Sequence, residues 1–202
     1  GDTMDVDGGI SSQISERITS TSEVLQSRRT KRTIRPTLAT KEEVQKYEQI
    51  QSQTGLHTTT QPGLTCLDIS LNQEQILTGG IDKKAVIYNR SSSKKEGEIK
   101  HTKSVSAVKF HPSNGSLITA GGNQIKISTK SGRGFKSSMI QSHKADVTGI
   151  DIHPCGDYLI SSSRDKTWGF HDLESASTVV QPEFGNELEC IQFHPDGVIL
   201  GA

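Results

Sequence analysis

Aromatic and apolar residues are scarce in this sequence. Aromatic side chains make up 4% of the 202 residues and apolar side chains 31%. Both values are low for a chain that folds throughout, because folding requires enough buried apolar surface to offset the lost conformational entropy. We therefore expect part of the chain to remain unfolded.

Net charge and long apolar runs are absent as well. Lys and Arg number 23, as do Asp and Glu, so no overall field attracts nucleic acid or a membrane. No run of about 18 apolar residues occurs, and the polar, acidic first residues do not resemble a signal peptide. We expect no membrane contact and no direct contact with nucleic acid.

A repeat of about 41 residues organises most of the chain. Three apolar residues spaced three and then two apart occur four times, as Leu64/Leu67/Ile69, Val105/Val108/Phe110, Val147/Ile150/Ile152 and Leu188/Ile191/Phe193. Successive copies lie 41, 42 and 41 residues apart. Short strands joined by tight turns at a period of about 40–45 residues are typical of propeller blades.

The fold that this repeat predicts is all-β. We expect an incomplete β-propeller over residues 56–202, with three blades and part of a fourth. Blades one to three occupy roughly 62–99, 100–141 and 142–183, and blade four stops in its second strand. Propellers close with about 4–8 blades, so we expect the chain to be a fragment of a longer one.

A mostly disordered segment with one or two short helices is expected before the propeller. Over residues 1–40 we expect a basic linker with a possible helix at 10–26, where isoleucines recur at helical spacing. Thr40 and Glu43 form a capping box, which predicts a second short helix over 41–55.

Basic residues cluster within this linker, and we call them the basic window: Arg28, Arg29, Lys31, Arg32 and Arg35. Such a cluster serves nuclear import or contacts phosphates. The alternative is a solvated linker, because most runs of charged residues are simply exposed to solvent.

Polar residues recur at fixed positions of the repeat. In blade three, His143, Ser161 and Asp165 form a Ser-His-Asp set, which suggests a hydrolase as one alternative. Equivalent positions carry His101, Thr119, Thr78 and Asp82. A nucleophile needs one activated copy in a cleft rather than a copy in each sheet. We therefore interpret these residues as a structural network within each blade, and we expect no catalytic residue and no cofactor.

The remaining histidines and the cysteines do not suggest a metal site. His111, His153 and His194 lie in the turns of successive blades, whereas zinc ligands must converge on one ion. His57 falls outside the repeat pattern and is expected to be solvated. The three cysteines are odd in number and not closely spaced. Cys66 and Cys190 occupy the repeat position that Ala107 and Gly149 fill in the other blades, which indicates small packing residues in a reducing compartment.

Several stretches carry a resemblance to known families. The repeats resemble the WD-repeat family, although Tyr88-Asn89, Ser128-Thr129 and His171-Asp172 stand where a Trp-Asp dipeptide is expected. More specifically, KEEVQKYEQIQSQTGLHTTTQPGLTCLDIS, ILTGGIDKKAVIYN, HKADVTGIDIHPCGDYLISSSRDKTWGF and CIQFHPDGVILG resemble the family of the pre-mRNA-processing factor that names the spliceosomal Nineteen Complex. The stretch ISSQISERITSTSEVLQSRRTKR resembles the linker that precedes that family's propeller.

This resemblance implies a nuclear ubiquitin-protein ligase that acts in pre-mRNA splicing, through spliceosome activation, and in DNA repair. In that family a U-box recruits the ubiquitin-conjugating enzyme, a coiled coil forms tetramers, and a seven-bladed propeller binds substrates and partners. The chain matches the linker and the first half of the propeller, so Nineteen Complex proteins and ubiquitination substrates are its expected partners. Contacts with the conjugating enzyme and tetramer formation would need the other segments. The alternative is a non-catalytic WD-repeat scaffold unrelated to ubiquitin transfer.

Overall fold

Two helices and fourteen strands make up the part of the chain that the computed structural model describes, residues 9–29, 38–59 and 63–202. The helices are α1 (Ser12–Arg29) and α2 (Lys41–Val44). The strands are β1 (Leu64–Ile69), β2 (Gln75–Gly80), β3 (Lys84–Asn89), β4 (Lys94–Lys100), β5 (Val105–Phe110), β6 (Leu117–Gly121), β7 (Gln124–Ser131), β8 (Gly134–Ile140), β9 (Val147–Ile152), β10 (Tyr158–Ser163), β11 (Trp168–Asp172), β12 (Ser177–Val180), β13 (Gln192–Phe193) and β14 (Leu200–Gly201).

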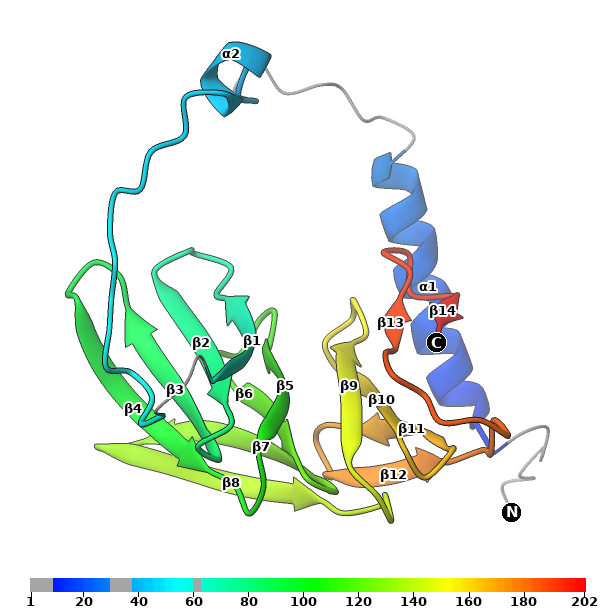
Figure 1. The fold of residues 1–202 in the computed structure, drawn as a ribbon. Coiled ribbons are helices and arrows are strands. Elements are labelled where there is room, and N and C mark those ends of the chain that lie inside the picture. The colour runs from blue at the N-terminus through cyan, green and yellow to red at the C-terminus, as the bar shows by residue number, and fades with distance from the viewer. Residues whose placement is uncertain (1–8, 30–37, 60–62) are drawn as a thin grey trace.

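The strands form four antiparallel meanders that stand side by side in an arc (Figure 1). Strands β1–β4, β5–β8 and β9–β12 make three four-stranded blades, and β13–β14 make a two-stranded one. The first strand of each blade contacts the first strand of the next. The predicted all-β, incomplete propeller is confirmed.

Apolar cores lie between neighbouring blades. Leu77 and Ile87 of blade one pack with Val105 and Val108 of blade two, and a second cluster joins blades two and three around Ile118, Ile125, Val147, Ile150 and Leu159. Strands β6 and β10 are buried along their whole length. Strand β6 lies between blades one and three, and β10 lies between blade two and a cluster formed with blade four and α1. Stacking one blade on the next therefore supplies the burial that a single sheet lacks.

Helix α1 packs on the far face of blade three and against blade four (Figure 1). Ile14 and Ile18 join the cluster around Phe170, and Arg17 binds Asp157 with 2.8 Å between Nε and Oδ2. Compared with the expected span 10–26, the helix starts later and continues to Arg29. The Ser11 hydroxyl accepts a hydrogen bond from the Ile14 amide at the start, which is typical of a helix cap.

Helix α2 is much shorter than the predicted helix over 41–55. The capping box of Thr40 and Glu43 is present, but the helix ends at Val44. Val44, Tyr47 and Ile50 are 49%, 78% and 88% exposed, so the apolar stripe meets no surface that would stabilise further turns. Helices this short are marginal without tertiary packing.

The cysteines are all free, and they differ in burial. Cys66 packs against the cluster between blades one and two. Cys190 is exposed, contrary to the expected packing role, because no further sheet of the described residues covers that side of blade four. No helix among residues 9–29, 38–59 and 63–202 is long and apolar enough to cross a membrane.

Candidate functional site

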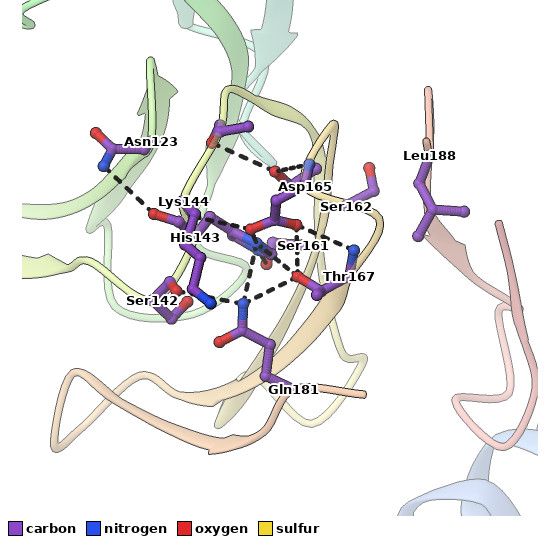
Figure 2. Close-up of polar contacts among 12 residues, drawn as sticks. Asn123, Ser142, His143, Lys144, Ser161, Ser162, Asp165, Thr167, Gln181 and Leu188 are labelled. Carbon is purple, nitrogen blue, oxygen red and sulfur yellow. Dashed lines mark hydrogen bonds and ion pairs between the residues drawn. The ribbon is translucent and has the colours of Figure 1, made fainter. Parts of the chain in front are cut away.

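The predicted polar residues of blade three meet at one point (Figure 2). His143, in the loop before β9, lies with Nδ1 3.1 Å from Asp165 Oδ2 and Nε2 2.7 Å from Ser161 Oγ. Asp165 sits in the turn between β10 and β11, and it also accepts hydrogen bonds from Thr167 and from the Lys144 amide. The network therefore connects the loop before β9 to strand β10 and to the turn between β10 and β11.

The network continues through a residue that the sequence analysis left out. Ser161 Oγ lies 2.6 Å from His171 Nε2, and His171 Nδ1 lies 3.0 Å from Thr178 Oγ1 on β12. One set of proton positions satisfies the chain of contacts from Thr178 to Asp165. Thr178 donates to His171, His171 Nε2–H donates to Ser161, Ser161 donates to His143, and His143 Nδ1–H donates to Asp165. Both imidazoles are then neutral.

Burial and hydrogen bonding shift the pKa values in the direction that this assignment requires. Burial alone would raise the pKa of Asp165, but hydrogen bonds from Thr167, the Lys144 amide and His143 outweigh it and lower the pKa to about 2. Burial lowers the pKa of His143, and burial beside His143 lowers the pKa of His171 to about 3. The chain of groups thus consists of a carboxylate and two neutral imidazoles near neutral pH.

Blade one contains an equivalent network, built on a histidine that was expected to be solvated. His57 Nδ1 lies 2.8 Å from Asp82 Oδ1, and its Nε2 lies 2.9 Å from Thr78 Oγ1. The Asp82 carboxylate also accepts from the Thr58 amide. The expectation for His57 was wrong because the loop is longer: His57 precedes Ile69 by twelve residues, whereas His101 and His143 precede Phe110 and Ile152 by nine.

Blade two has only half of the network. His101 Nε2 lies 2.8 Å from Thr119 Oγ1, whereas its buried Nδ1 makes no hydrogen bond with any described residue. The turn between β6 and β7 holds two residues, Gly122 and Asn123, so it is too short to present an aspartate. Asn123 instead donates to the His143 carbonyl. Burial and the ammonium group of Lys126 lower the pKa of His101 to about 4.

A second kind of contact joins one blade to the next. His111 Nε2 donates to the Gly156 carbonyl at 2.7 Å, and His153 Nε2 to the Gly197 carbonyl at 3.1 Å. Both glycines have positive φ, +86° and +80°, which turns the carbonyl toward the preceding blade. The sequence predicted that His111 and His153 lie in turns, but it did not reveal these hydrogen bonds between blades. Each acceptor is a backbone carbonyl group about 45 residues further along the chain.

Nucleophilic chemistry is not supported at Ser161. Its side chain has no exposed surface, and its hydroxyl group is held between two imidazoles. An attacking serine needs a substrate carbonyl within reach and a base free to accept its proton. Nor do the described residues contain a group of three His, Cys, Asp or Glu placed to hold a metal ion.

The basic window is only partly described. Arg28 and Arg29 form the last turn of α1, and Arg29 binds Asp196 of blade four with 2.6 Å between Nη2 and Oδ2. Cations in a last helical turn are favoured by the helix dipole. The other three residues of the window, Lys31, Arg32 and Arg35, lie outside the described residues.

Two hollows flank the boundary between blades two and three. One, of about 720 Å³, lies at the turns that hold His111 and Gly156, and its rim carries Arg17, Lys136 and Asp172. The other, of about 460 Å³, lies at the opposite ends of the strands. Its rim is lined by charges of both signs: Lys83, Lys103, Asp146, Arg164 and Glu189. Both rims carry charged residues, as the rims of protein–protein contacts commonly do.

Known proteins share both the repeats and the wider sequence. The family model "WD domain, G-beta repeat" matches residues 94–127 and 134–172. Each match starts at the last strand of one blade, β4 or β8, and ends at the third strand of the next.

Pre-mRNA-processing factor 19 of Bos taurus is 35% identical over 210 residues, which cover 100% of this chain and 42% of the relative. The Caenorhabditis elegans protein of that name is 38% identical over 170 residues, 81% of this chain and 34% of the relative. Pre-mRNA-processing factor 19 homolog 2 of Arabidopsis thaliana is 34% identical over 200 residues, 96% of this chain and 38% of the relative. The chain thus spans less than half the length of these curated relatives.

Proposed function

The chain is a WD-repeat relative of pre-mRNA-processing factor 19, and we therefore propose that it is the substrate- and partner-binding propeller portion of a nuclear ubiquitin-protein ligase. The ligase acts in pre-mRNA splicing, through spliceosome activation, and in DNA repair. Its partners are proteins of the spliceosomal Nineteen Complex and the substrates that are ubiquitinated.

One observation carries this proposal. The similarity runs along the whole chain, including the segment before the blades, at 35–36% identity with the relatives from cattle and mouse. Shared WD repeats alone would match only the repeated part of the chain, which the family model finds within residues 94–172. Similarity outside the repeats therefore supports kinship with this particular group of splicing factors.

The blade geometry is compatible with a binding role. The polar networks bury their donors and acceptors inside the sheets, so the blades are stiff supports for the exposed turns. The two hollows lie at these turns, at opposite ends of the boundary between blades two and three. Exposed loops on a rigid scaffold are common places for protein recognition.

The splicing role is tested by depleting the protein in the cells that make it. We expect unspliced transcripts to accumulate, and re-expression of the complete polypeptide to restore splicing. A variant with Asp165→Ala and Asp82→Ala should restore it less well, because both blade networks lose their carboxylate. Unchanged splicing after depletion would contradict the proposal.

Ubiquitin transfer is tested separately with the complete polypeptide and a ubiquitin-conjugating enzyme. Formation of ubiquitin chains supports the ligase. A splicing defect without ubiquitin transfer by the purified protein would favour the alternative, a non-catalytic WD-repeat scaffold.

Nuclear entry is proposed to depend on the basic window. Replacing its five basic residues with Gln in a fluorescent fusion should lower nuclear accumulation. The matched control is Arg29→Gln alone, because Arg29 is engaged with Asp196. An undiminished nuclear signal in the fivefold variant would show that the window is an ordinary linker.

A further inference from the structure

Blades one and three each hold a carboxylate between the same two donors, a histidine Nδ1 and the backbone amide of the residue that follows. In blade one these donors are His57 and Thr58, which lie 2.8 and 2.9 Å from the Asp82 oxygens. Blade three repeats the arrangement around Asp165, with 3.1 Å to the histidine nitrogen and 2.8 Å to the amide. The two aspartate side chains are 5% and 7% exposed, so the carboxylate position lies just beneath the surface.

Blade two presents the same two donors without a carboxylate. Neither the buried His101 Nδ1 nor the Thr102 amide forms a hydrogen bond with any residue that the structure describes. The ring is oriented as in the other blades, because its Nε2 lies 2.8 Å from Thr119 Oγ1 on the second strand. The backbone of Gly121 lies beside Nδ1 without accepting a hydrogen bond from it, and Gly80 lies beside the equivalent nitrogen in blade one.

The turn between β6 and β7 explains why blade two supplies no carboxylate of its own. Gly121 pairs with Gln124, which leaves two turn residues, whereas three residues, 164–166, fill the equivalent turn of blade three. Asn123, the polar residue of the short turn, donates to the His143 carbonyl and does not contact His101. The two donors are therefore left to a group from outside the blade.

A hollow gives such a group access to these donors. The hollow of about 460 Å³ is lined by Thr102, Lys103 and Gly122, and Thr102 is exposed. The aliphatic part of Lys103 lies over Gly122, because a Cβ atom there would come within 3.2–3.3 Å of its carbons. A lysine side chain is flexible, so it can move aside for an entering group and pair with its charge.

The charge around the hollow favours an anion. Residues 100–141, which include blade two, contain seven Lys and Arg residues and no Asp or Glu. The ammonium group of Lys126 contributes to the low pKa of His101, as expected where the local potential is positive. Lys83 lines the hollow as well and forms no ion pair with the described residues.

We propose that His101 Nδ1 and the Thr102 amide bind a carboxylate of a partner protein, an aspartate or glutamate side chain that takes the place of the missing turn aspartate. When the Thr119 hydroxyl donates to Nε2, Nδ1 carries the proton that the carboxylate accepts, as His143 Nδ1 does for Asp165. Hydrogen bonds to a charged acceptor are the stronger kind. The inference rests on the proposed partner-binding role and names the chemistry of the partner's group.

The test follows the ring nitrogens of the 202-residue chain by NMR, with isotope-labelled histidines, at neutral pH and constant ionic strength. The probes are acetyl-Gly-Glu-Gly-amide, its Gln counterpart and sodium acetate. We expect the Glu peptide to shift the His101 Nδ1 signal saturably, with an affinity about tenfold or more above that of the Gln peptide. His57 and His143 serve as internal controls, because aspartates already occupy their Nδ1 atoms.

The outcomes separate the possible ligands. A response confined to His101 and to the Glu peptide supports the proposal. No response, an equal response to the Gln peptide, or equal shifts of all histidines overturns it. If acetate binds and the Glu peptide does not, the site admits only a small free carboxylate and the proposed partner is wrong. Splicing is not measured here, so failure of this test leaves the proposed splicing role to its own experiment.

A turn graft supplies the carboxylate from within the chain. Gly122-Asn123 is replaced by Arg-Asp-Lys, the turn of blade three, and the matched control carries Arg-Ala-Lys instead. We expect the aspartate graft to have the higher midpoint of chemical denaturation, because its carboxylate satisfies His101 Nδ1 and the Thr102 amide. Equal midpoints would show that no carboxylate fits beside His101 and would overturn the proposal. The titration of the unaltered chain decides the question if neither graft folds.

Discussion

At the residue scale, each four-stranded blade contains a buried histidine that forms a hydrogen bond with a hydroxyl group of its second strand. The blades differ in whether the other ring nitrogen of this histidine contacts an aspartate. Blades one and three have an aspartate in the turn between their second and third strands, and blade two has none. Among the described residues, His101 Nδ1 has no hydrogen-bond partner, and a buried polar atom without a partner costs free energy.

Replacing Asp165 with Ala should lower the free energy of unfolding by about 1–3 kcal/mol, since His143, Thr167 and the Lys144 amide would lose a common acceptor. The midpoint of chemical denaturation measures this change. Asp146→Ala is the control: its ion pair with Lys103 is exposed, and such pairs contribute little. An unchanged midpoint in the Asp165 variant would show that the network does not stabilise the blade.

Acid should destabilise blade three through His171. The pKa of His171 is about 3 in the folded chain, against about 6.5 in the unfolded chain. Below pH 6.5 the unfolded state therefore binds a proton at His171 that the folded state does not bind until the pH approaches 3. This stability is complete above about pH 6.5 and is lost as the pH falls toward 3. Between pH 6.5 and 4.5 the loss amounts to about 2–3 kcal/mol.

His171→Gln tests this pH dependence, because an amide can still donate to Ser161 and accept from Thr178 without titrating. Denaturation midpoints at a series of pH values should change less with acid in this variant. His194→Gln, at a half-exposed histidine, serves as the control. An acid response equal to that of the unaltered chain would contradict the assigned role of His171.

At the element scale, helix α1 depends on its tertiary contacts. Ser and Thr interrupt its sequence and lower its intrinsic helix propensity, and isolated helices of about this length are marginal. Burial of Ile14 and Ile18, together with the Arg17–Asp157 and Arg29–Asp196 pairs, holds it against blades three and four.

Ile18→Ser should release α1, since it removes one of the two isoleucines that reach the cluster around Phe170. We expect faster amide exchange over Ser12–Arg29 and faster tryptic cleavage at Arg17. Val24→Ser is the control, because Val24 is 49% exposed. If both variants exchange alike, burial of Ile18 does not hold the helix.

At the scale of the whole molecule, no described sheet covers the outer face of blade one, whereas the first strands of blades two and three contact the first strand of the preceding blade. Leu64, Leu67 and Ile69 of β1 are 61%, 66% and 46% exposed, whereas Val105 and Val108 at equivalent positions are 0% and 3% exposed. Each such side chain would gain about 1.5–3 kcal/mol by burial.

The 202-residue chain should therefore associate through the β1 face rather than remain a monomer. Light scattering should show species larger than one chain, and Leu64→Gln/Leu67→Gln should reduce them. A monodisperse monomer that melts cooperatively would show that this face does not drive association.

The sequence by itself determined the all-β class, the blade repeat and the positions of the network residues. These features depend on the spacing of side chains along a strand, which alternates with a fixed period and can be counted without a structure. The same spacing failed to identify His57 as a network residue. Three extra loop residues separate His57 from the first strand of its blade, yet its side chain still reaches Asp82 and Thr78.

Tertiary structure alone decided which of these elements find partners. Helix α1 packs on blade three, α2 ends at Val44, and His101 Nδ1 finds no partner among the described residues. Each outcome depends on whether a surface distant in the sequence lies within contact distance. The tertiary structure also brought Lys130 and Lys136 to the same end of the sheet, because β7 pairs with β8 across a two-residue turn.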